Sequence, residues 1–342
     1  MSVRHFGWMP DGTQVLEASL SSDAGARCHV ITYGGAVRDL LVPLADDHLR
    51  RVVLGFQTLD GYLADRNYIG VTVGRTASRI RRGRIRVDGR DYQLALNDRG
   101  RVHLHGGTVG FGARPWRLLA AEADSVMLGL TSPAGDQGYP GALDAQCLYR
   151  LEADTTLRVI MTATTDAPTV INLAHHSYFN LLPGSSVRQH TLQVRAASLL
   201  RLDDEMLPTG ELRPVADTSA DFRMTRLIGE TDEGFDMAFV LDEPRKDAAT
   251  LWSPDRNIRM TVETSEPCLV FYDGGHMVPG GAGYHGAPYR PHDGLCLEPM
   301  RFLDGPNQPA FPSWELRPGT VYRQETLYRF DTMPQEGMLP TH

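Results

Sequence analysis

Short segments in which hydrophobic and polar residues alternate recur along the whole chain, and they constrain its fold more than any other feature. A period of two is the pattern of a β-strand that buries one of its faces. Each segment is about the length of an ordinary strand. We therefore expect strands at residues 28–33, 37–42, 126–131, 157–164, 192–194, 258–263 and 269–272.

Turn formers separate these segments, and few windows show helical periodicity. The 342 residues include 34 glycines and 22 prolines. The pair Asp88-Gly89 between two strand-like runs predicts a hairpin. Short helical turns are expected at residues 196–201 and 225–229. The pattern predicts an all-β fold, a large antiparallel β-sandwich, and the lack of a linker-like tract or internal repeat predicts a single domain over residues 1–342.

Charge and cysteine usage narrow the partners and the compartment. The net charge is −8 without a basic stripe, which argues against nucleic acid as a partner. We find no signal-peptide pattern and no run approaching 18 apolar residues, so we expect a cytoplasmic protein without a membrane partner. The cysteines are scattered without a C-x-x-C pair, which is typical of reduced thiols and not of a disulfide framework or zinc site: Cys28, Cys147, Cys268 and Cys296.

Two adjacent histidines, His175 and His176, lie between an apolar, β-branched run and a stretch rich in turn formers. Imidazole is the side chain best suited to proton transfer near neutral pH. On an extended backbone consecutive side chains point to opposite faces. We therefore expect only one of the two histidines to enter a pocket, and the other to pack or to position it.

A second candidate, Glu298, shares one face of a predicted strand with Cys296. Pro299 follows at once and cannot donate a hydrogen bond to a sheet ladder. We therefore expect Glu298 at the end of its strand, where a carboxylate can reach a cleft. A histidine and a glutamate at strand ends are the minimum for paired acid–base catalysis.

His103 and His105 fall on the same face of a short predicted strand. Three interpretations stay open: a metal pair, two polar residues at a strand end, or a histidine at position 105 that faces a substrate. The metal interpretation is the weakest, because residues 106–112 contain no carboxylate to complete such a site.

Arg75 and Arg79, four residues apart among small residues, are a further candidate pair. A guanidinium fork can hydrogen-bond a polyhydroxylated ligand, and it can equally tie loops together. Asp236, between Phe235 and Phe239, can cap a turn or accept hydrogen bonds from sugar hydroxyls beside an apolar ring.

Taken together, these segments resemble the aldose 1-epimerase (galactose mutarotase) family over almost the whole chain. The matching stretches are residues 7–12, 31–35, 53–56, 74–80, 104–107, 208–211, 307–313, 316–319 and 328–330. The resemblance implies the galactose mutarotase-like supersandwich fold and a cofactor-independent isomerase without a metal. It also implies a small-molecule sugar as substrate, and a monomer or homodimer.

By position, the resemblance implies that His176 is the general acid and Glu298 the general base, with Arg79, His105 and Asp236 binding sugar hydroxyls. Glu298 would take the proton of the anomeric hydroxyl while His176 protonates the ring oxygen. The ring opens, the C1–C2 bond rotates, and the ring closes on the other face. We expect mutual attraction to lower the pKa of Glu298 and to raise that of His176.

The chain departs from the common family pattern in ways that remove polar groups from the cleft. The departures are Ser78, His175, Met237, Ala238, Val270 and the Pro299-Met300 pair. They leave the sugar open: galactose or glucose is the default, and a pentose, a 6-deoxy sugar or a modified sugar are alternatives. Other functions also stay open, namely an epimerase of a specialised sugar, a non-catalytic carbohydrate-binding protein, and a metal-dependent enzyme that uses His103 and His105.

Overall fold

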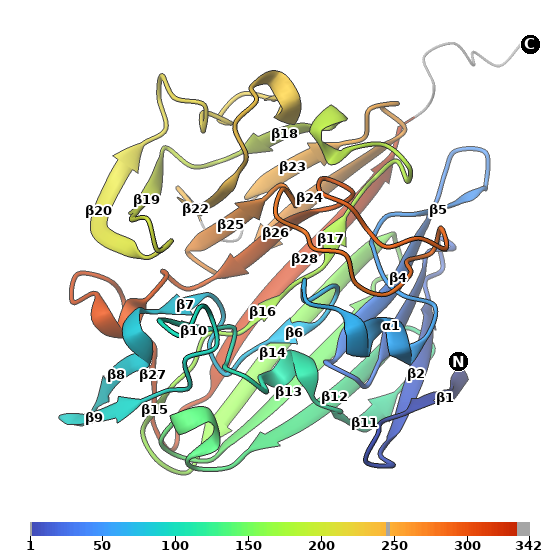
Figure 1. The fold of residues 1–342 in the computed structure, drawn as a ribbon. Coiled ribbons are helices and arrows are strands. Elements are labelled where there is room, and N and C mark those ends of the chain that lie inside the picture. Colours follow the sequence, from blue (N-terminus) through green and yellow to red (C-terminus); the bar gives the residue numbers. More distant parts are fainter. Residues whose placement is uncertain (1, 244–246, 334–342) are drawn as a thin grey trace, which may run out of the picture.

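The computed structural model describes residues 2–243 and 247–333, and three antiparallel sheets dominate it (Figure 1). The five-stranded sheet has the order β1 (Ser2–Trp8), β2 (Gln14–Ser21), β3 (Arg27–Ile31), β4 (Ala36–Pro43), β5 (Leu49–Arg51). The nine-stranded sheet has the order β11 (Arg117–Ala121), β12 (Ser125–Ser132), β13 (Leu143–Leu151), β14 (Thr156–Thr165), β28 (Tyr322–Thr332), β24 (Ile258–Thr264), β23 (Ala249–Trp252), β18 (Thr191–Val194), β21 (Arg226–Leu227). The six-stranded sheet has the order β17 (Tyr178–Phe179), β26 (Leu295–Met300), β25 (Cys268–Tyr272), β22 (Asp236–Val240), β19 (Ser198–Leu202), β20 (Pro208–Pro214).

Four two-stranded ribbons and one α-helix complete the regular structure of the described residues. The ribbons are β6 (Thr72–Val73) with β16 (Ala174–His175), β7 (Arg79–Ile80) with β10 (His103–Leu104), β8 (Arg84–Val87) with β9 (Arg90–Gln93), and β15 (Thr169–Val170) with β27 (Glu315–Leu316). The helix is α1 (Leu59–Ala64). Within residues 2–243 and 247–333, no helix has the length and apolar character needed to cross a bilayer.

The predicted all-β architecture is confirmed. All seven predicted strand segments are strands whose ends differ from the prediction by no more than two residues. The predicted hairpin turns at Asp88 and Gly89, whose positive φ values of 48° and 74° suit a type I′ turn.

The helical turns were predicted less well. Residues 196–201 lie largely in β19, because Ser198 and Leu199 pair with both β20 and β22. Residues 225–229 form the short strand β21 and the start of a 3₁₀ turn. The six-residue helix α1 was not predicted.

The nine-stranded and six-stranded sheets pack face to face around the largest apolar cluster. Leu269, Phe271 and Leu297 of the six-stranded sheet share that cluster with Val262 and Tyr328 of the nine-stranded sheet. Because alternate residues of a strand point to opposite faces, the residues between them on β25 and β26 turn away from this core. The second face of the six-stranded sheet is thereby left to line a cavity.

Strand β28 lies at the centre of the nine-stranded sheet, between β14 and β24. Its side chains reach through the core to the strands of the cavity. Gln324 Nε2 donates to the carbonyl of Pro299 at 2.9 Å, and the backbone N–H of Leu173 donates to the Tyr322 hydroxyl at 3.2 Å. Both segments singled out in the sequence therefore rest on β28.

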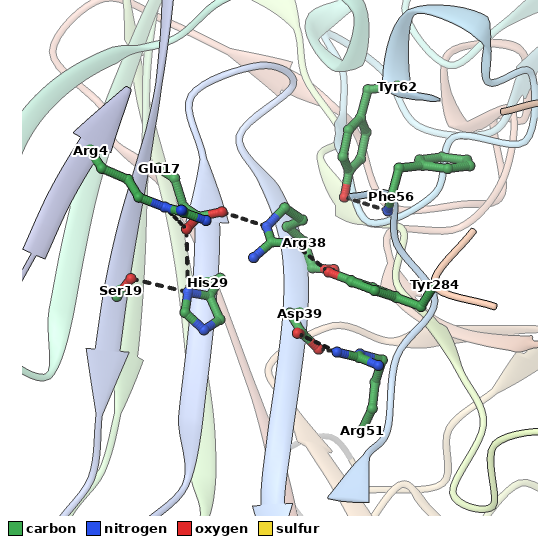
Figure 2. A network of polar contacts seen from close by, with 10 residues as sticks. All are labelled: Arg4, Glu17, Ser19, His29, Arg38, Asp39, Arg51, Phe56, Tyr62 and Tyr284. Carbon is green, nitrogen blue, oxygen red and sulfur yellow. Dashed lines mark hydrogen bonds and ion pairs between the residues drawn. The ribbon is translucent and has the colours of Figure 1, made fainter. Parts of the chain in front are cut away.

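A buried charged network fastens the long connection between β25 and β26 to the five-stranded sheet (Figure 2). Glu17 is fully buried, and its Oε2 lies 2.5 Å from Nε of Arg38. Burial acts to raise the pKa of Glu17, but hydrogen bonds from His29 and Arg4 and the charge of Arg38 lower this pKa to about 2. Arg38 donates to the hydroxyl of Tyr284 at 2.7 Å, and that hydroxyl donates to the Arg38 carbonyl at 3.1 Å.

Candidate active site

The register of the six-stranded sheet sets the candidate acid and base side by side. Tyr178 of β17 pairs with Cys296 of β26, so the residue two positions earlier, His176, lies beside Glu298. On the other side of β26, Glu298 pairs with Val270 of β25. His176, in the segment just before β17, thus forms one row of side chains with Glu298 of β26 and Val270 of β25, on the face turned away from the main core.

A cavity of about 680 Å³ opens over this row. It is lined by all five residues that the sequence nominated, namely Arg79, His105, His176, Asp236 and Glu298. Its size suits a small ligand. A second cavity of about 610 Å³, beside Tyr284 and Tyr289, contains none of these residues.

The His176–Glu298 pair is close and shielded from water. His176 Nε2 lies 3.6 Å from Glu298 Oε1, and the two side chains are 6% and 4% exposed. On the other side of the ring, His176 Nδ1 lies 3.6 Å from Cys296 Sγ, within hydrogen-bond range for sulfur. The ring is thus held between a thiol and a carboxyl group.

The pKa values of the pair move opposite to our expectation. Burial, followed by the charge of Asp236, raises the pKa of Glu298 well above its usual value. Burial lowers the pKa of His176 to about 4. The expected mutual attraction is outweighed because both groups are desolvated and Glu298 Oε2 has no hydrogen-bond partner among the described residues. In the free pocket, burial therefore favours the uncharged form of each group, the protonated carboxyl and the neutral imidazole.

His175 points away from the cavity, as the extended backbone predicted. Its ring lies against the rings of Tyr149 and Tyr328, with centroids 5.6 and 6.1 Å away, and its Nε2 is 2.7 Å from the Ser177 hydroxyl. Burial lowers the pKa of His175 to about 3. His175 is a neutral packing residue in the sandwich core.

The remaining predicted residues surround the cavity with polar groups. Arg79 is held by Asp98, with Nε 3.2 Å from Oδ2. His105 accepts a hydrogen bond at Nδ1 from the backbone N–H of Ser78 at 3.2 Å, which leaves Nε2 available to a ligand. Asp236 begins β22, and burial raises its pKa while the charge of Arg79 opposes that shift.

The other arginine, Arg75, ties loops together and does not line the cavity, which is the second of the two roles that the sequence left open. It is 1% exposed and donates to the carbonyls of Pro140 and Gly141, each at 2.9 Å, and to the Ser132 hydroxyl at 2.6 Å. Arg75 therefore ties three loop segments together beneath the cavity wall.

The geometry does not support a metal shared by His103 and His105. The strand β10 ends at Leu104, and His105 adopts a positive φ of 47°, so the alternation that would place both rings on one face is broken. Both ring nitrogens of His103 are engaged, by the Ala95 carbonyl at 2.7 Å and the Tyr139 hydroxyl at 2.5 Å. His103 belongs to the buried scaffold behind the cavity.

Among the described residues, His176, Cys296 and Glu298 have potential metal-ligand atoms within 4.8 Å of one another. Burial raises the pKa of the Cys296 thiol well above its usual value. A cation would have to displace that thiol proton and to compete with a proton for Glu298, whose pKa is raised. The same three groups are better matched to holding protons than to holding a metal.

One positional expectation for Glu298 was wrong. Strand β26 does not stop before Pro299 but continues to Met300, so Glu298 lies inside the strand. Pro299 is tolerated because it pairs with Leu269 of β25 alone, whereas β17 pairs with β26 only at residues 295–296. The strand on that side has ended, and no ladder hydrogen bond needs the missing N–H.

Several lining residues were not predicted. Tyr178 follows His176 by two positions, and the period of two could have identified it. Tyr68, whose ring centroid is 4.7 Å from that of His105, sits in a loop at a positive φ of 60° and gave no signal in the sequence. The other unpredicted ionisable or aromatic residues that line the cavity are Arg66, Arg99, Arg188, Asp232, Tyr272, Asp273, His276 and His292, whereas Phe235 lines it as the sequence had offered.

Comparisons with known proteins agree over almost the whole chain. The sequence model of the family described as aldose 1-epimerase matches residues 17–329. An aldose 1-epimerase of Escherichia coli is 35% identical over 94% of this chain and 96% of its own, and a galactose mutarotase of Homo sapiens is 35% identical over 95% and 97%. The crystal structure of an aldose epimerase homologue from C. elegans superposes with a TM-score of 0.88 at 29% identity, covering 93% of this chain and 99% of that one.

Proposed function

The chain belongs to the aldose 1-epimerase family and is an isomerase of that class, and we propose that His176 and Glu298 carry out its proton transfers. The observation that supports these roles is the pair itself. An imidazole and a carboxyl group lie 3.6 Å apart in a shielded cavity of the size of a small ligand. We assign His176 as the general acid and Glu298 as the general base.

Ring opening conserves the number of protons on the pair. The anomeric hydroxyl loses a proton to Glu298, the ring oxygen gains one from His176, and the C1–O5 bond breaks to leave an open-chain aldehyde. Rotation about C1–C2 presents the other face of the carbonyl. The reverse transfers then close the ring as the opposite anomer, and the pair again holds one proton.

A bound sugar would favour the ionised form of Glu298 and the protonated form of His176. The anomeric O–H donates to the carboxylate, whose Oε2 has no hydrogen-bond partner among the residues that the structure describes. The ring oxygen accepts from the protonated Nε2 of His176. Hydrogen bonds to the charged forms favour those forms, so substrate binding itself prepares the ionised base and the protonated acid.

Arg79, His105 and Asp236 are proposed to bind the remaining hydroxyls. Burial, followed by the neighbouring His176, holds the pKa of His105 well below its usual value, so its free Nε2 acts as a neutral hydrogen-bonding group. Arg79 donates and the carboxylate of Asp236 accepts. The three surround the row of His176 and Glu298 and would fix the ring over it.

The direct test is NMR exchange spectroscopy of anomer interconversion with a panel of free aldoses, above the uncatalysed rate of each. Galactose stands first in the panel because relatives carry it in their names, and glucose second. Acceleration of at least one aldose is expected. Binding without acceleration would favour a carbohydrate-binding protein on the same scaffold.

The pH profile should be bell-shaped, with limbs that are set by the pair. The working form holds one proton. As the pH falls below the His176 pKa of about 4, His176 takes up a second proton, and as the pH rises above the raised pKa of Glu298 the pair loses its only one. A profile of kcat/KM, which reports the free enzyme, should therefore have its acid limb near pH 4 and its alkaline limb displaced upward from the ordinary pKa of a carboxyl group. The ¹⁵N shifts of labelled His176 should show a neutral ring at pH 7, and an imidazolium there would contradict this assignment.

The variant His175→Asn serves as the matched control for this profile. Because His175 packs in the core, the change should lower the midpoint of thermal unfolding and leave both limbs of the profile in place. Loss of a limb in this variant would mean that the proton-transfer roles belong to the other histidine.

A further inference from the structure

The neighbour of Glu298 on the side away from His176 is apolar. Val270 lines the cavity, is 9% exposed, and pairs in turn with Ala238, which is fully buried. Leu200 belongs to the same apolar cluster as these two residues. None of the three side chains carries a hydrogen-bonding group. A polar group of a ligand placed over Val270 therefore finds no partner in this row.

The order of the row fixes which part of a sugar lies there, provided that the proposed function holds. Glu298 pairs with Val270 on one side, and His176 Nε2 lies 3.6 Å from Glu298 Oε1 on the other side. In the proposed orientation, the ring oxygen lies at His176 and the anomeric oxygen at Glu298. Along the same direction, the next ring position would be the carbon beside the anomeric carbon, and its substituent would point toward Val270.

Asp236 does not restore a polar partner at this point. It pairs with Tyr272 in the adjacent row and lies two strands from Glu298, so in the proposed orientation it would bind hydroxyls further round the ring. At the opposite end, beyond His176, the cavity is polar and aromatic, with Tyr68 and His105. One end of the sugar would therefore contact the apolar Val270, and the other end would contact polar and aromatic side chains.

We propose that Val270 makes this site selective for aldoses without a hydroxyl at the carbon beside the anomeric centre, that is, for 2-deoxyaldoses. A hydroxyl buried against Val270 loses its hydrogen bonds to water and gains none, whereas a hydrogen atom at that position loses nothing. The inference rests on the proposed function, because it uses the orientation of the ring over His176 and Glu298.

The test compares kcat/KM for 2-deoxygalactose and galactose on one enzyme, and for 2-deoxyglucose and glucose, each after subtraction of the uncatalysed rate. A site that binds a hydroxyl by hydrogen bonds rejects the analogue lacking it by several orders of magnitude. Because the proposed site favours the deoxy sugar, we expect a deoxy-to-parent ratio above about one for the wild type. A lower ratio for both sugar pairs would overturn the inference.

Val270→Thr adds a hydroxyl at nearly constant volume, and Val270→Gln adds a longer amide. Each should lower the deoxy-to-parent ratio by about tenfold or more. Both kcat/KM values in a ratio are measured with the same variant. An effect of the new group on Glu298 changes both values alike and therefore cancels in the ratio. Val270→Ile is the apolar control and should leave the ratio unchanged. A 6-deoxy sugar, altered at the opposite end of the ring, is the substrate control.

The outcomes separate the two proposals. If no aldose is interconverted faster than in buffer, the proposed function fails. If aldoses are interconverted but neither polar variant changes the deoxy-to-parent ratio, the role of Val270 fails while the proposed function stands. Thermal unfolding of each variant shows whether it is folded. If one of the two polar variants does not fold, the other still tests the role of Val270.

Discussion

Replacing Glu298 by glutamine should slow anomer interconversion about 10²–10⁴-fold, the usual cost of losing one general acid–base partner. Glutamine matches the carboxyl group in shape but can neither accept the anomeric proton nor return one. The fold should survive, because burial favours the uncharged form of Glu298, which glutamine resembles in shape and charge. The measurements are NMR exchange rates on the best aldose and the midpoint of thermal unfolding.

A matched control is Asp232→Asn, which removes another carboxylate from the lining of the same cavity. Asp232 is exposed, unlike the buried Glu298, so near-normal turnover is expected. The assignment of Glu298 as base would be wrong if Glu298→Gln kept near-normal turnover. Equal losses in both variants would point to the charge of the cavity and not to proton transfer.

His176→Asn should cause a loss of similar size. Asparagine can donate a hydrogen bond to the ring oxygen, but it cannot deliver a proton and take one back. The control is His276→Asn, since His276 lines the outer part of the cavity and is exposed. Turnover of His176→Asn close to that of the wild type would remove His176 from the mechanism.

The double variant tests whether the two residues act as one unit. Two independent losses of about 10³ would multiply to about 10⁶, whereas groups that share one proton are expected to show little further loss after the first substitution. Multiplicative losses would indicate that His176 and Glu298 act on separate steps.

The strands could be predicted because their signal is local. Alternation along β14, β24 and β25 needs no knowledge of the partner strand. The same alternation correctly separated His175 from His176. The row of His176, Glu298 and Val270 could not be predicted, because it depends on the register between strands that lie more than a hundred residues apart in sequence.

The direction of the pKa shifts was mispredicted for a physical reason. Two opposite charges in water attract, and that attraction was the basis of the expectation. In the folded chain both groups lie in a shielded cavity, and the cost of desolvating a charge exceeds the attraction. Sequence shows which groups are present but not how much water remains around them. The roles of the individual residues came from family resemblance and stay predictions until the variants are measured.

The central position of β28 has a consequence for synthesis on the ribosome. This strand, residues 322–332, joins β14 to β24, and its side chains support the segments that carry His176 and Glu298. A nascent chain that has reached residue 321 therefore holds two separate parts of a sheet, each with an unpaired edge. Such edges are sites of aggregation. The nine-stranded sheet, and with it the support of the two site segments, can therefore be completed only after the eleven residues of β28 have left the exit tunnel.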